Sequence, residues 1–347
     1  MKYYAGLDVS LKSTAVCVVD HDGTVIKEEM VSSDPQAITT FLVDTGLTFE
    51  LVGMEAGSLA PWLYHGLFAA GLPVICLETR HAKAALQAQT VKTDRNDARG
   101  LAHILRTGWF KSVHIKSEAS QKWRVLLNNR SGLVDKRVDI SNQIRGTLKV
   151  FGLKVGHVSK AAYETRIRTL LVGDTELEAL MLPLLTARRV LVEQERQLDK
   201  TIRARVKADP VCRRLMSIPG VGVLTALAFK SAIDQPRRFQ KSRDVGAHLG
   251  LTPRKYASGE VDYNGHITKC GDALLRPHLY EAAQVLLTRV AKWSKLKAWG
   301  VKLAKRSSMK NACVAVARKL AVLMHRIWMD ETTFQWGQEP RTLSTGT

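Results

Sequence analysis

Hydrophobic and polar residues alternate through the first thirty positions of the chain, as in strands that bury one face. Short polar stretches divide this region into three runs, and His21-Asp22-Gly23 between the second and third is a tight-turn signal. The pattern therefore predicts three consecutive strands, over Tyr3–Asp8, Thr14–Asp20 and Thr24–Met30.

Beyond this meander, apolar residues recur every three to four positions in some segments and form short continuous runs in others. Helices are predicted over Pro35–Thr45, Leu59–Ala70 and Asp94–Thr107, with strands over Glu50–Glu55 and Pro73–Glu78. The order βββαβαβα predicts a mixed sheet flanked by helices. Ribonuclease-H-like nucleases have this order, so the expected fold class of the N-terminal domain is α/β and ribonuclease-H-like.

Two long polar helices with apolar stripes follow. Leu126, Leu133 and Ile140 are seven residues apart within 118–150, and a second stripe runs from Leu177 to Ile202. The spacing predicts an antiparallel helical pair or coiled-coil arm, which either forms a dimer or packs only within the chain. Pro183 either kinks the second helix or starts its main part.

From Val211 onward, glycine punctuates the sequence. Ile218-Pro-Gly-Val-Gly222 predicts a turn between two helices, similar to the hairpin of helix-hairpin-helix DNA-binding modules, although such turns also serve packing alone. Loops are predicted over 249–260 and 265–272, then basic amphipathic helices over Leu274–Lys305 and Met309–Trp328. The predicted domains are an acidic domain with candidate catalytic carboxylates (1–115), a helical arm (116–208), a basic, mainly α-helical domain with a candidate catalytic serine (209–330) and a loose polar tail (331–347).

The net charge of +20 over 347 residues is distributed unevenly. Residues 1–60 contain three Lys/Arg and nine Asp/Glu, whereas residues 201–320 contain 24 Lys/Arg and seven Asp/Glu. This asymmetry favours nucleic acid as the partner of the second half over a merely soluble basic surface. Five scattered cysteines without a C-x-x-C pair indicate a reducing cytoplasm rather than disulfides or zinc, and no apolar run is long enough for a membrane span.

Acidic residues lie where the predicted strands and the third helix end or begin. Asp94 and Asp97 share one face of a helix start, and this pair alone fits helix capping better than metal binding. Asp8 and Glu55 end two predicted strands, where ligands gather in open α/β sheets. Four converging carboxylates need cations to offset their repulsion, so the set predicts a Mg²⁺ site of the two-metal, phosphodiester-cleaving type.

The basic half contains candidate contacts to nucleic acid and a candidate nucleophile. Lys and Arg suit phosphates and tryptophans suit stacking on bases. The candidate contacts are Gly220, Gly222, Arg237, Arg238, Lys241, Arg243, Arg254, Lys255, Lys269, Trp293 and Trp299. Ser258 lies among cationic residues that would favour its alkoxide, although most Ser-Gly pairs in loops are only turns.

A set of motifs occurs in order along the chain. They are Gly6-Leu-Asp-Val-Ser10, Met54-Glu-Ala56, Thr93-Asp-Arg-Asn-Asp-Ala98, Ile218-Pro-Gly-Val-Gly222, Leu249-Gly-Leu-Thr-Pro253, Ser258-Gly259 and Gly265-His-Ile-Thr-Lys-Cys-Gly-Asp272. Together, over roughly residues 3 to 325, the chain resembles the DEDD transposases of the insertion-sequence one-ten family, the bridge-RNA-guided recombinases.

The resemblance implies a Holliday-junction-resolvase-like (RuvC-like) N-terminal domain, a coiled-coil arm and a C-terminal transposase domain. It implies that Asp8, Glu55, Asp94 and Asp97 bind Mg²⁺ and that Ser258 attacks a DNA phosphate to form a phosphoserine link. Ala257 stands before the serine where relatives often carry another small polar residue. Ser307 and Ser308 also lie among basic residues and are alternative nucleophiles.

The resemblance also implies partners and a location. These are target and donor DNA, a non-coding guide RNA that pairs with both, and homodimers that pair into tetramers. In these assemblies the acidic domain of one protomer meets the serine of another. The implied location is the bacterial cytoplasm, with the protein at the nucleoid during the reaction. No membrane partner is expected.

Two other functions stay open at this stage. A junction-resolving nuclease would use metal-activated water and no covalent intermediate. A non-catalytic nucleic-acid-binding scaffold would use the carboxylates only as helix caps. A sugar-kinase-like start (Gly-x-Asp-x-Ser) ranks last, because the chain offers no second phosphate loop.

Overall fold

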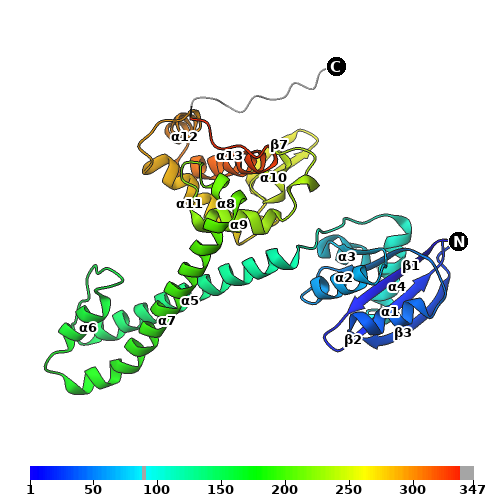
Figure 1. The fold of residues 1–347 in the computed structure, drawn as a ribbon, viewed down its shortest axis with the longest axis horizontal. Coiled ribbons are helices and arrows are strands. Elements are labelled where there is room, and N and C mark those ends of the chain that lie inside the picture. Colours follow the sequence, from blue (N-terminus) through cyan, green and yellow to red (C-terminus); the bar gives the residue numbers. More distant parts are fainter. Residues whose placement is uncertain (88–90, 337–347) are drawn as a thin grey trace. The chain divides into compact units, whose positions relative to one another are not determined.

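The computed structural model describes residues 1–87 and 91–336 and divides the chain into two compact units between Lys116 and Ser117 (Figure 1). Unit 1 is the N-terminal α/β domain, and unit 2 contains the arm and the C-terminal helices. The bases of the arm helices supply Leu127, Ile202 and Val206 to the C-terminal core. The predicted finer division at 208/209 therefore stays a prediction.

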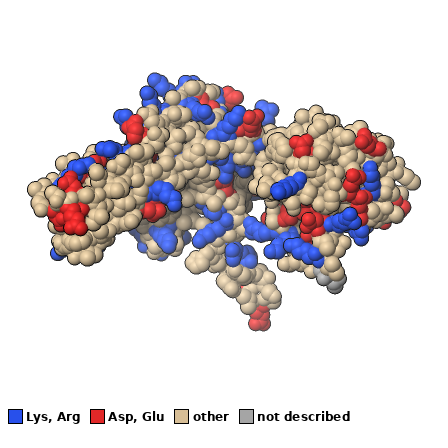
Figure 2. Space-filling view, turned by 90° about the horizontal axis from the view of Figure 1, so that it is seen from below, with Lys and Arg blue, Asp and Glu red and all other residues tan. Residues whose placement is uncertain are grey.

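The charge asymmetry of the sequence is visible on the surface. On the face shown in Figure 2, acidic side chains are most frequent on unit 1, at the right, and Lys and Arg are spread over both units. No helix in the described ranges has both the length and the apolar composition that crossing a bilayer requires.

Unit 1 is built on a five-stranded mixed sheet with the order β3-β2-β1-β4-β5. The strands are β1 Tyr3–Val9, β2 Ser13–Val19, β3 Val25–Ser32, β4 Phe49–Glu55 and β5 Val74–Leu77. β1 is antiparallel to β2 and parallel to β4, and β4 is parallel to β5. This topology confirms the predicted ribonuclease-H-like α/β class, and the central pair β1–β4 places two strand carboxyl ends side by side.

Helices cover both faces of this sheet. α1 (Pro35–Val43) and α2 (Ala60–Ala69) pack on one face, and α4 (Asp94–Thr107) packs on the other against β1 and β2. A short helix, α3 (Thr79–Leu86), precedes α4 and was not predicted. Only Ala82 of α3 is buried, so the helix has no apolar stripe that periodicity could detect.

The arm in unit 2 consists of α5 (Glu118–Val150) and α7 (Thr175–Ala208), which pack along each other, with α6 (Tyr163–Leu171) at the far end (Figure 1). α7 begins eight residues before Pro183, so the prediction that this proline starts the main helix is wrong. The buried leucine near the base of α5 is Leu127, whereas the predicted Leu126 is only half-buried.

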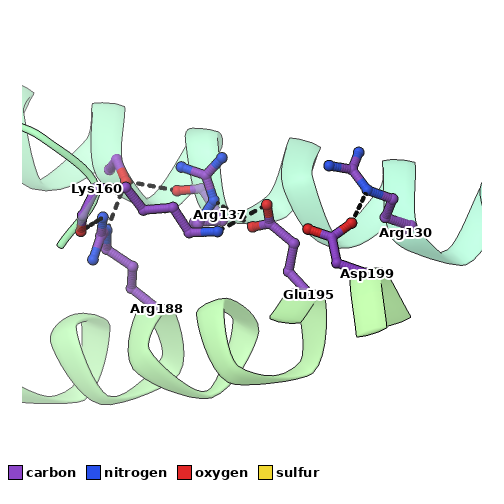
Figure 3. A network of polar contacts seen from close by, with 7 residues as sticks. Arg130, Arg137, Lys160, Arg188, Glu195 and Asp199 are labelled. Atoms are coloured by element: carbon purple, nitrogen blue, oxygen red, sulfur yellow. Dashed lines mark hydrogen bonds and ion pairs between the residues drawn. The ribbon is translucent and has the colours of Figure 1, made fainter. Parts of the chain in front are cut away.

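Polar side chains replace the expected apolar seam in the middle of the arm (Figure 3). Glu195 of α7 is buried. Its carboxylate forms ion pairs with Arg137 Nε of α5 at 2.9 Å and with Lys160 Nζ at 2.8 Å. Arg188 donates to Ser141 Oγ at 3.0 Å, and Arg130 pairs with Asp199 at 2.6 Å. Since each of these groups must meet its partner, the layer fixes the register of the two arm helices.

The C-terminal part of unit 2 is helical around one core. Its elements are α8 Pro210–Leu215, α9 Val223–Ile233, η1 Pro236–Arg238, α10 Asp244–His248, β6 Pro253–Ser258, β7 Val261–Ile267, α11 Leu275–Thr288, α12 Lys295–Arg306 and α13 Met309–Met329. The nearly all-buried α9 packs with α11 and α13, and together they form the centre of this core.

Three predictions about this region are corrected. The two glycine-rich segments predicted as loops form an antiparallel hairpin, β6–β7, because they pair with each other across a Gly259-Glu260 turn. The helix predicted over Leu274–Lys305 is two helices, since Ser294 caps a new one by accepting the Lys297 N–H. The start of the predicted loose tail is anchored, because Phe334 packs on the core and donates to Ser217 Oγ; residues 337–347 lie outside the described residues.

Candidate functional site

The sheet places Asp8 and Glu55 at matching positions on neighbouring parallel strands. Leu7 pairs with Met54 in the β1–β4 register, so Asp8 and Glu55 are the next residues on their strands. Side chains alternate between the two faces of a strand, so Asp8 shares a face with Gly6, and Glu55 shares a face with Gly53. This is the face that α4 covers.

Glycine at both underlying positions lets α4 come close, and at Gly6 it is required because an added Cβ would meet the helix backbone. A Cβ at Gly6 would lie 2.2 Å from the carbonyl oxygen of Ala98, and a Cβ at Gly53 would lie 2.6 Å from Leu105 Cδ2. The Gly-Leu-Asp motif thus combines a contact that admits the helix with a carboxylate at the strand end. The same pattern recurs in Gly53-Met-Glu55.

The N-terminus of α4 presents Asp94 and Asp97 beside this strand end. Thr93 is the N-cap, and its hydroxyl accepts the Asn96 N–H at 3.2 Å. Asp94 is therefore the first helical residue, and the prediction that it caps the helix is wrong. Neither carboxylate is used as the cap, although both lie in the first turn, where the helix dipole favours negative charge.

The electrostatic interactions among the four carboxylates show that they lie in one site. Burial, and after it the charges of Asp94, Asp97 and Glu55, together raise the pKa of Asp8 to about 6, while the charge of Lys92 opposes them. The pKa of Glu55 is also raised, by burial first and by Asp97, against a hydrogen bond from Thr79. The structure thus brings together all four acidic residues singled out in the sequence.

The donor set fits Mg²⁺, which binds carboxylate oxygens and usually keeps several waters. None of the four carboxylates takes part in an ion pair within the described part of the chain, and the more distant charges of Lys83 and Lys92 offset their repulsion only in part. No three of them, among the described residues, bring oxygen atoms within 4.8 Å of one another.

A tighter acidic cluster, Asp20-His21-Asp22, lies in the β2–β3 turn. Asp20 Oδ1 accepts the backbone N–H groups of residues 22, 23 and 24, each at 2.9 Å. These hydrogen bonds, with that of Thr24 first, lower the pKa of Asp20. The cluster is explained by its turn and is no candidate metal site.

Sequence reasoning missed the polar residues that surround the acids. The Thr79 hydroxyl donates to the Ala56 carbonyl at 3.0 Å and contacts Glu55, and the charges of Lys83 and Lys92 lower the pKa of Glu55. Thr79 and Lys83 lie on α3, the helix that periodicity did not show. The only indication of these two residues in the sequence was their position shortly after the end of β5.

Ser258 is the last residue of β6 and is exposed near the tip of the hairpin. It pairs with Val261, and Gly259 has a φ of 54°, which suits the first position of a two-residue hairpin turn. No side-chain hydrogen bond of Ser258 is found among the described residues, so none of the described residues of unit 2 acts as a hydrogen-bonded base for it. A serine in this setting needs activation from elsewhere.

The alternative serines have structural roles. Ser308 is the N-cap of α13 and accepts the Asn311 N–H at 3.1 Å. Ser307 Oγ accepts Asn311 Nδ2 at 2.8 Å. Both hydroxyls therefore stabilise the α12–α13 junction, which leaves Ser258 as the better candidate nucleophile.

The basic candidates divide into exposed side chains and one that is turned inward. Arg237, Lys241, Arg243, Arg254, Lys255 and Lys269 are exposed. Lys255 pairs with Asp262 across the hairpin at 2.6 Å. Arg238 donates to the Ile233 carbonyl at 3.1 Å and lies over the Phe239 ring, so its role is structural and the prediction of a nucleic-acid contact loses its basis.

The candidate contacts in the glycine turn and at the two tryptophans also differ in how far they are exposed. Gly220 packs against α11, because a Cβ there would lie 2.4 Å from the Ala282 carbonyl, whereas Gly222 is exposed at the N-terminus of α9. The packing alternative therefore accounts for Gly220. Trp293 is 61% exposed with Lys297 over its ring, and Trp299 is 37% exposed with Lys319 at 4.2 Å. Both indoles thus remain available to a base.

Comparisons with known proteins agree with the resemblance in the sequence. Residues 5–152 match the DEDD-type IS110 model, described as "Transposase", and residues 212–298 match "Transposase IS116/IS110/IS902 family". The chain is 31% identical to the transposase for insertion sequence element IS1111A of Coxiella burnetii, over 96% of this chain and 91% of that protein. It is 30% identical to the transposase for insertion sequence element IS1328 of Yersinia enterocolitica, over 70% of this chain and 75% of that protein.

Among solved structures, a Thermus thermophilus RuvC structure matches 32% of this chain and 99% of its own length, at 18% identity and a TM-score of 0.26. The identity and coverage of the bacterial relatives settle the family independently of this match. The chain belongs to the IS110 family of insertion-sequence transposases, and it is a DNA transposase.

Proposed function

We propose that this transposase cuts and rejoins DNA with Mg²⁺ held by Asp8, Glu55, Asp94 and Asp97 and with Ser258 as the nucleophile. The observation that carries the proposal is that the other three carboxylates lie near enough to Asp8 for their charges to raise its pKa. Carboxylates gathered in this way repel one another unless one is protonated or a cation binds, and such clusters with raised pKa values are typical of functional sites. Bound there, Mg²⁺ would polarise the scissile phosphate and offset the charge that develops in the transition state.

The reaction at the phosphate then takes place in two steps, cleavage and rejoining. Ser258 Oγ forms a bond to phosphorus, the bond from phosphorus to one sugar oxygen breaks, and that oxygen leaves as a hydroxyl. The phosphoserine link conserves the energy of the phosphodiester, so a sugar hydroxyl of another strand can attack it and release Ser258 without an external energy source. The exposed hairpin tip suits a residue that must reach a DNA backbone.

The serine needs an activating group, and none of the described residues of unit 2 forms a hydrogen bond with its hydroxyl. We propose that the acidic residues of one protomer and Ser258 of another act on the same phosphate, in dimers that pair into tetramers. A non-coding guide RNA that pairs with target and donor DNA is part of the same proposal. It is supported by the family resemblance and by the basic second half, which suits either nucleic acid.

A covalent-adduct assay tests the nucleophile. Protein incubated with Mg²⁺, guide RNA and end-labelled donor DNA is expected to form a detergent-resistant protein–DNA adduct that Ser258→Ala abolishes. Ser258 is exposed, so the variant should keep the parent's melting temperature. Ser307→Ala and Ser308→Ala are the matched controls and should keep the adduct.

Two outcomes would contradict the proposal. An adduct that persists in Ser258→Ala moves the nucleophile elsewhere, and Mg²⁺-dependent nicking by that variant without any adduct indicates a water-using nuclease. Unchanged strand transfer by Asp8→Asn would leave the carboxylates without a catalytic role and favour a scaffold.

A further inference from the structure

A large open pocket lies in unit 2 beside the β6–β7 hairpin. Its volume is about 1680 Å³, and the hairpin, α12, α13 and residues 334–336 line it. We call it the hairpin pocket. Pockets for drug-sized ligands occupy about 300–1000 Å³, so this one is too large to be explained by a single small molecule.

Aromatic rings are prominent in its lining. The pair Tyr256 and Tyr263 faces each other across the hairpin, with ring centroids 4.9 Å apart and planes at 19°. They nevertheless stay 43% and 55% exposed, so each ring keeps a free surface toward solvent. Trp299 and Trp336 also line the pocket. The pair stabilises the hairpin as a cross-strand aromatic contact, and its solvent-facing surface is open to stacking by a further planar group.

Positively charged side chains also line the pocket. The positively charged lining residues include Arg254, Lys269, Lys295, Lys310, Arg318 and Lys319. None of these six pairs with a carboxylate of the described residues, and no Asp or Glu is among the described residues that line the pocket. Among the described residues, the pocket therefore has positive charge without a carboxylate counter-ion in its lining.

We propose that the hairpin pocket binds an unpaired polynucleotide strand, with its bases stacked on Tyr256, Tyr263 and Trp299 and its phosphates against the surrounding lysines and arginines. Alternating aromatic and cationic groups are what a single strand requires, because each nucleotide offers one flat face and one negative charge. A base pair inside a duplex keeps its faces stacked on its neighbours and cannot use the rings. This inference rests on the proposed function, which supplies strands that unpair during exchange, and it adds to that function the class of strand and the place that holds it.

The source of the strand is either the guide RNA or the DNA displaced from a duplex. Both have the chemistry that the pocket recognises, and a 2′-hydroxyl is the difference between them. Binding of labelled oligo-U and oligo-dT of one length to the full-length protein separates the two. Whichever binds more tightly identifies the source, and tighter binding of either than of a dA·dT duplex at the same salt concentration supports the pocket.

Variants of the tyrosine pair locate the binding. Tyr256→Leu and Tyr263→Leu should each weaken single-strand binding about tenfold, the loss of one base–aromatic stack, with a smaller change for the duplex. Tyr256→Phe and Tyr263→Phe keep the ring and should bind like the parent. Trp62→Leu removes a 51%-exposed tryptophan on α2, outside the pocket, and should leave binding unchanged.

A second measurement covers the case in which a leucine destabilises the hairpin. Lys295→Gln and Lys310→Gln lie on helices and should each lower the salt dependence of single-strand binding by about one charge. Single-strand binding unaffected by both leucine and glutamine variants overturns the inference, as does an equal loss for duplex. Continued formation of the Ser258 adduct alongside such a result would mean that the pocket inference fails while the proposed function stands.

Discussion

Gly6 of β1 lies directly beneath Ala98 of α4, and a Cβ on Gly6 would be 2.2 Å from the Ala98 carbonyl oxygen. The same atom would be 2.4 Å from the Ala102 N atom, so backbone rather than a movable side chain would be in the way. This contact sets the distance between the helix that carries Asp94 and Asp97 and the strand that ends in Asp8.

Gly6→Ala should therefore separate α4 from β1. Overpacking of this kind costs about 1–3 kcal/mol, and a displacement of about 1 Å at a reacting centre costs about 10²-fold in rate. We expect a lower melting temperature together with a strand-transfer rate reduced by that order. Gly132→Ala in α5 is the control, because nothing lies within 4 Å of its Cβ and alanine favours helix; it should hold or raise stability. An unchanged rate in Gly6→Ala would show that the distance is not critical.

The pKa of Asp8 makes stability depend on pH. Its folded pKa, about 6, lies above the ordinary aspartate pKa of 3.8, so the favourable contribution of the protonated form is complete below pH 3.8 and is lost as the pH rises through 6. Without divalent cations, Asp8→Asn should be more stable than the parent at pH 8. Because the carboxylate is partly open to solvent screening, the expected difference is about 1 kcal/mol.

Thermal unfolding in chelator at pH 5 and pH 8 measures this difference. The advantage of Asp8→Asn should shrink at pH 5, and added Mg²⁺ should reverse it at pH 8 by stabilising only the parent. An Asn variant that is less stable than the parent at pH 8 in chelator would contradict the proposed repulsion.

Glu195 is the centre of the polar layer in the arm (Figure 3). Burial would raise its pKa, but hydrogen bonds from Lys160 and Arg137 outweigh burial and lower it. Its contribution to stability is therefore present above the usual glutamate range and is lost as the pH falls through the lowered value. Glu195→Gln should destabilise the arm by about 3 kcal/mol at neutral pH, since two cations lose their partner.

Glu193, two residues away, pairs with Arg196 on the surface and is the matched control. Glu193→Gln should change the stability little. Thermal unfolding followed by helical circular dichroism gives both values, and equal losses in the two variants would show that the buried position has no special role.

The sheet and its acidic edge were predictable because local patterns specify them. Alternation gave β1 to β3, and residue type at the strand ends gave Asp8 and Glu55, whose neighbourhood follows from the parallel β1–β4 pairing. By contrast, α3 has one buried residue and the β6–β7 hairpin is exposed along most of its length, so neither has a strong hydrophobic pattern. Their structure depends on pairing and capping that the periodicity of a single segment does not encode.

The location of a candidate functional side chain was predictable where the residue pattern has few structural explanations. It was not predictable where the residue type has several common roles. Four acids in a set order have few structural explanations, whereas an arginine such as Arg238 serves equally well as a phosphate contact or as a cap on the Ile233 carbonyl. Only tertiary neighbours decide between these roles. The same holds for Gly220, which the α11 backbone makes a packing residue.

Direct titration of divalent cation onto the purified protein tests the central claim that the four carboxylates form one cation site. Mn²⁺ in place of Mg²⁺ allows free and bound metal to be measured by electron paramagnetic resonance. We predict tight binding to the parent that Asp8→Asn, Glu55→Gln, Asp94→Asn and Asp97→Asn each weaken at least tenfold while the fold is kept. The double variant Asp20→Asn/Asp22→Asn, in the turn cluster, should bind like the parent; if binding is instead lost there and kept in the other four, the account is contradicted.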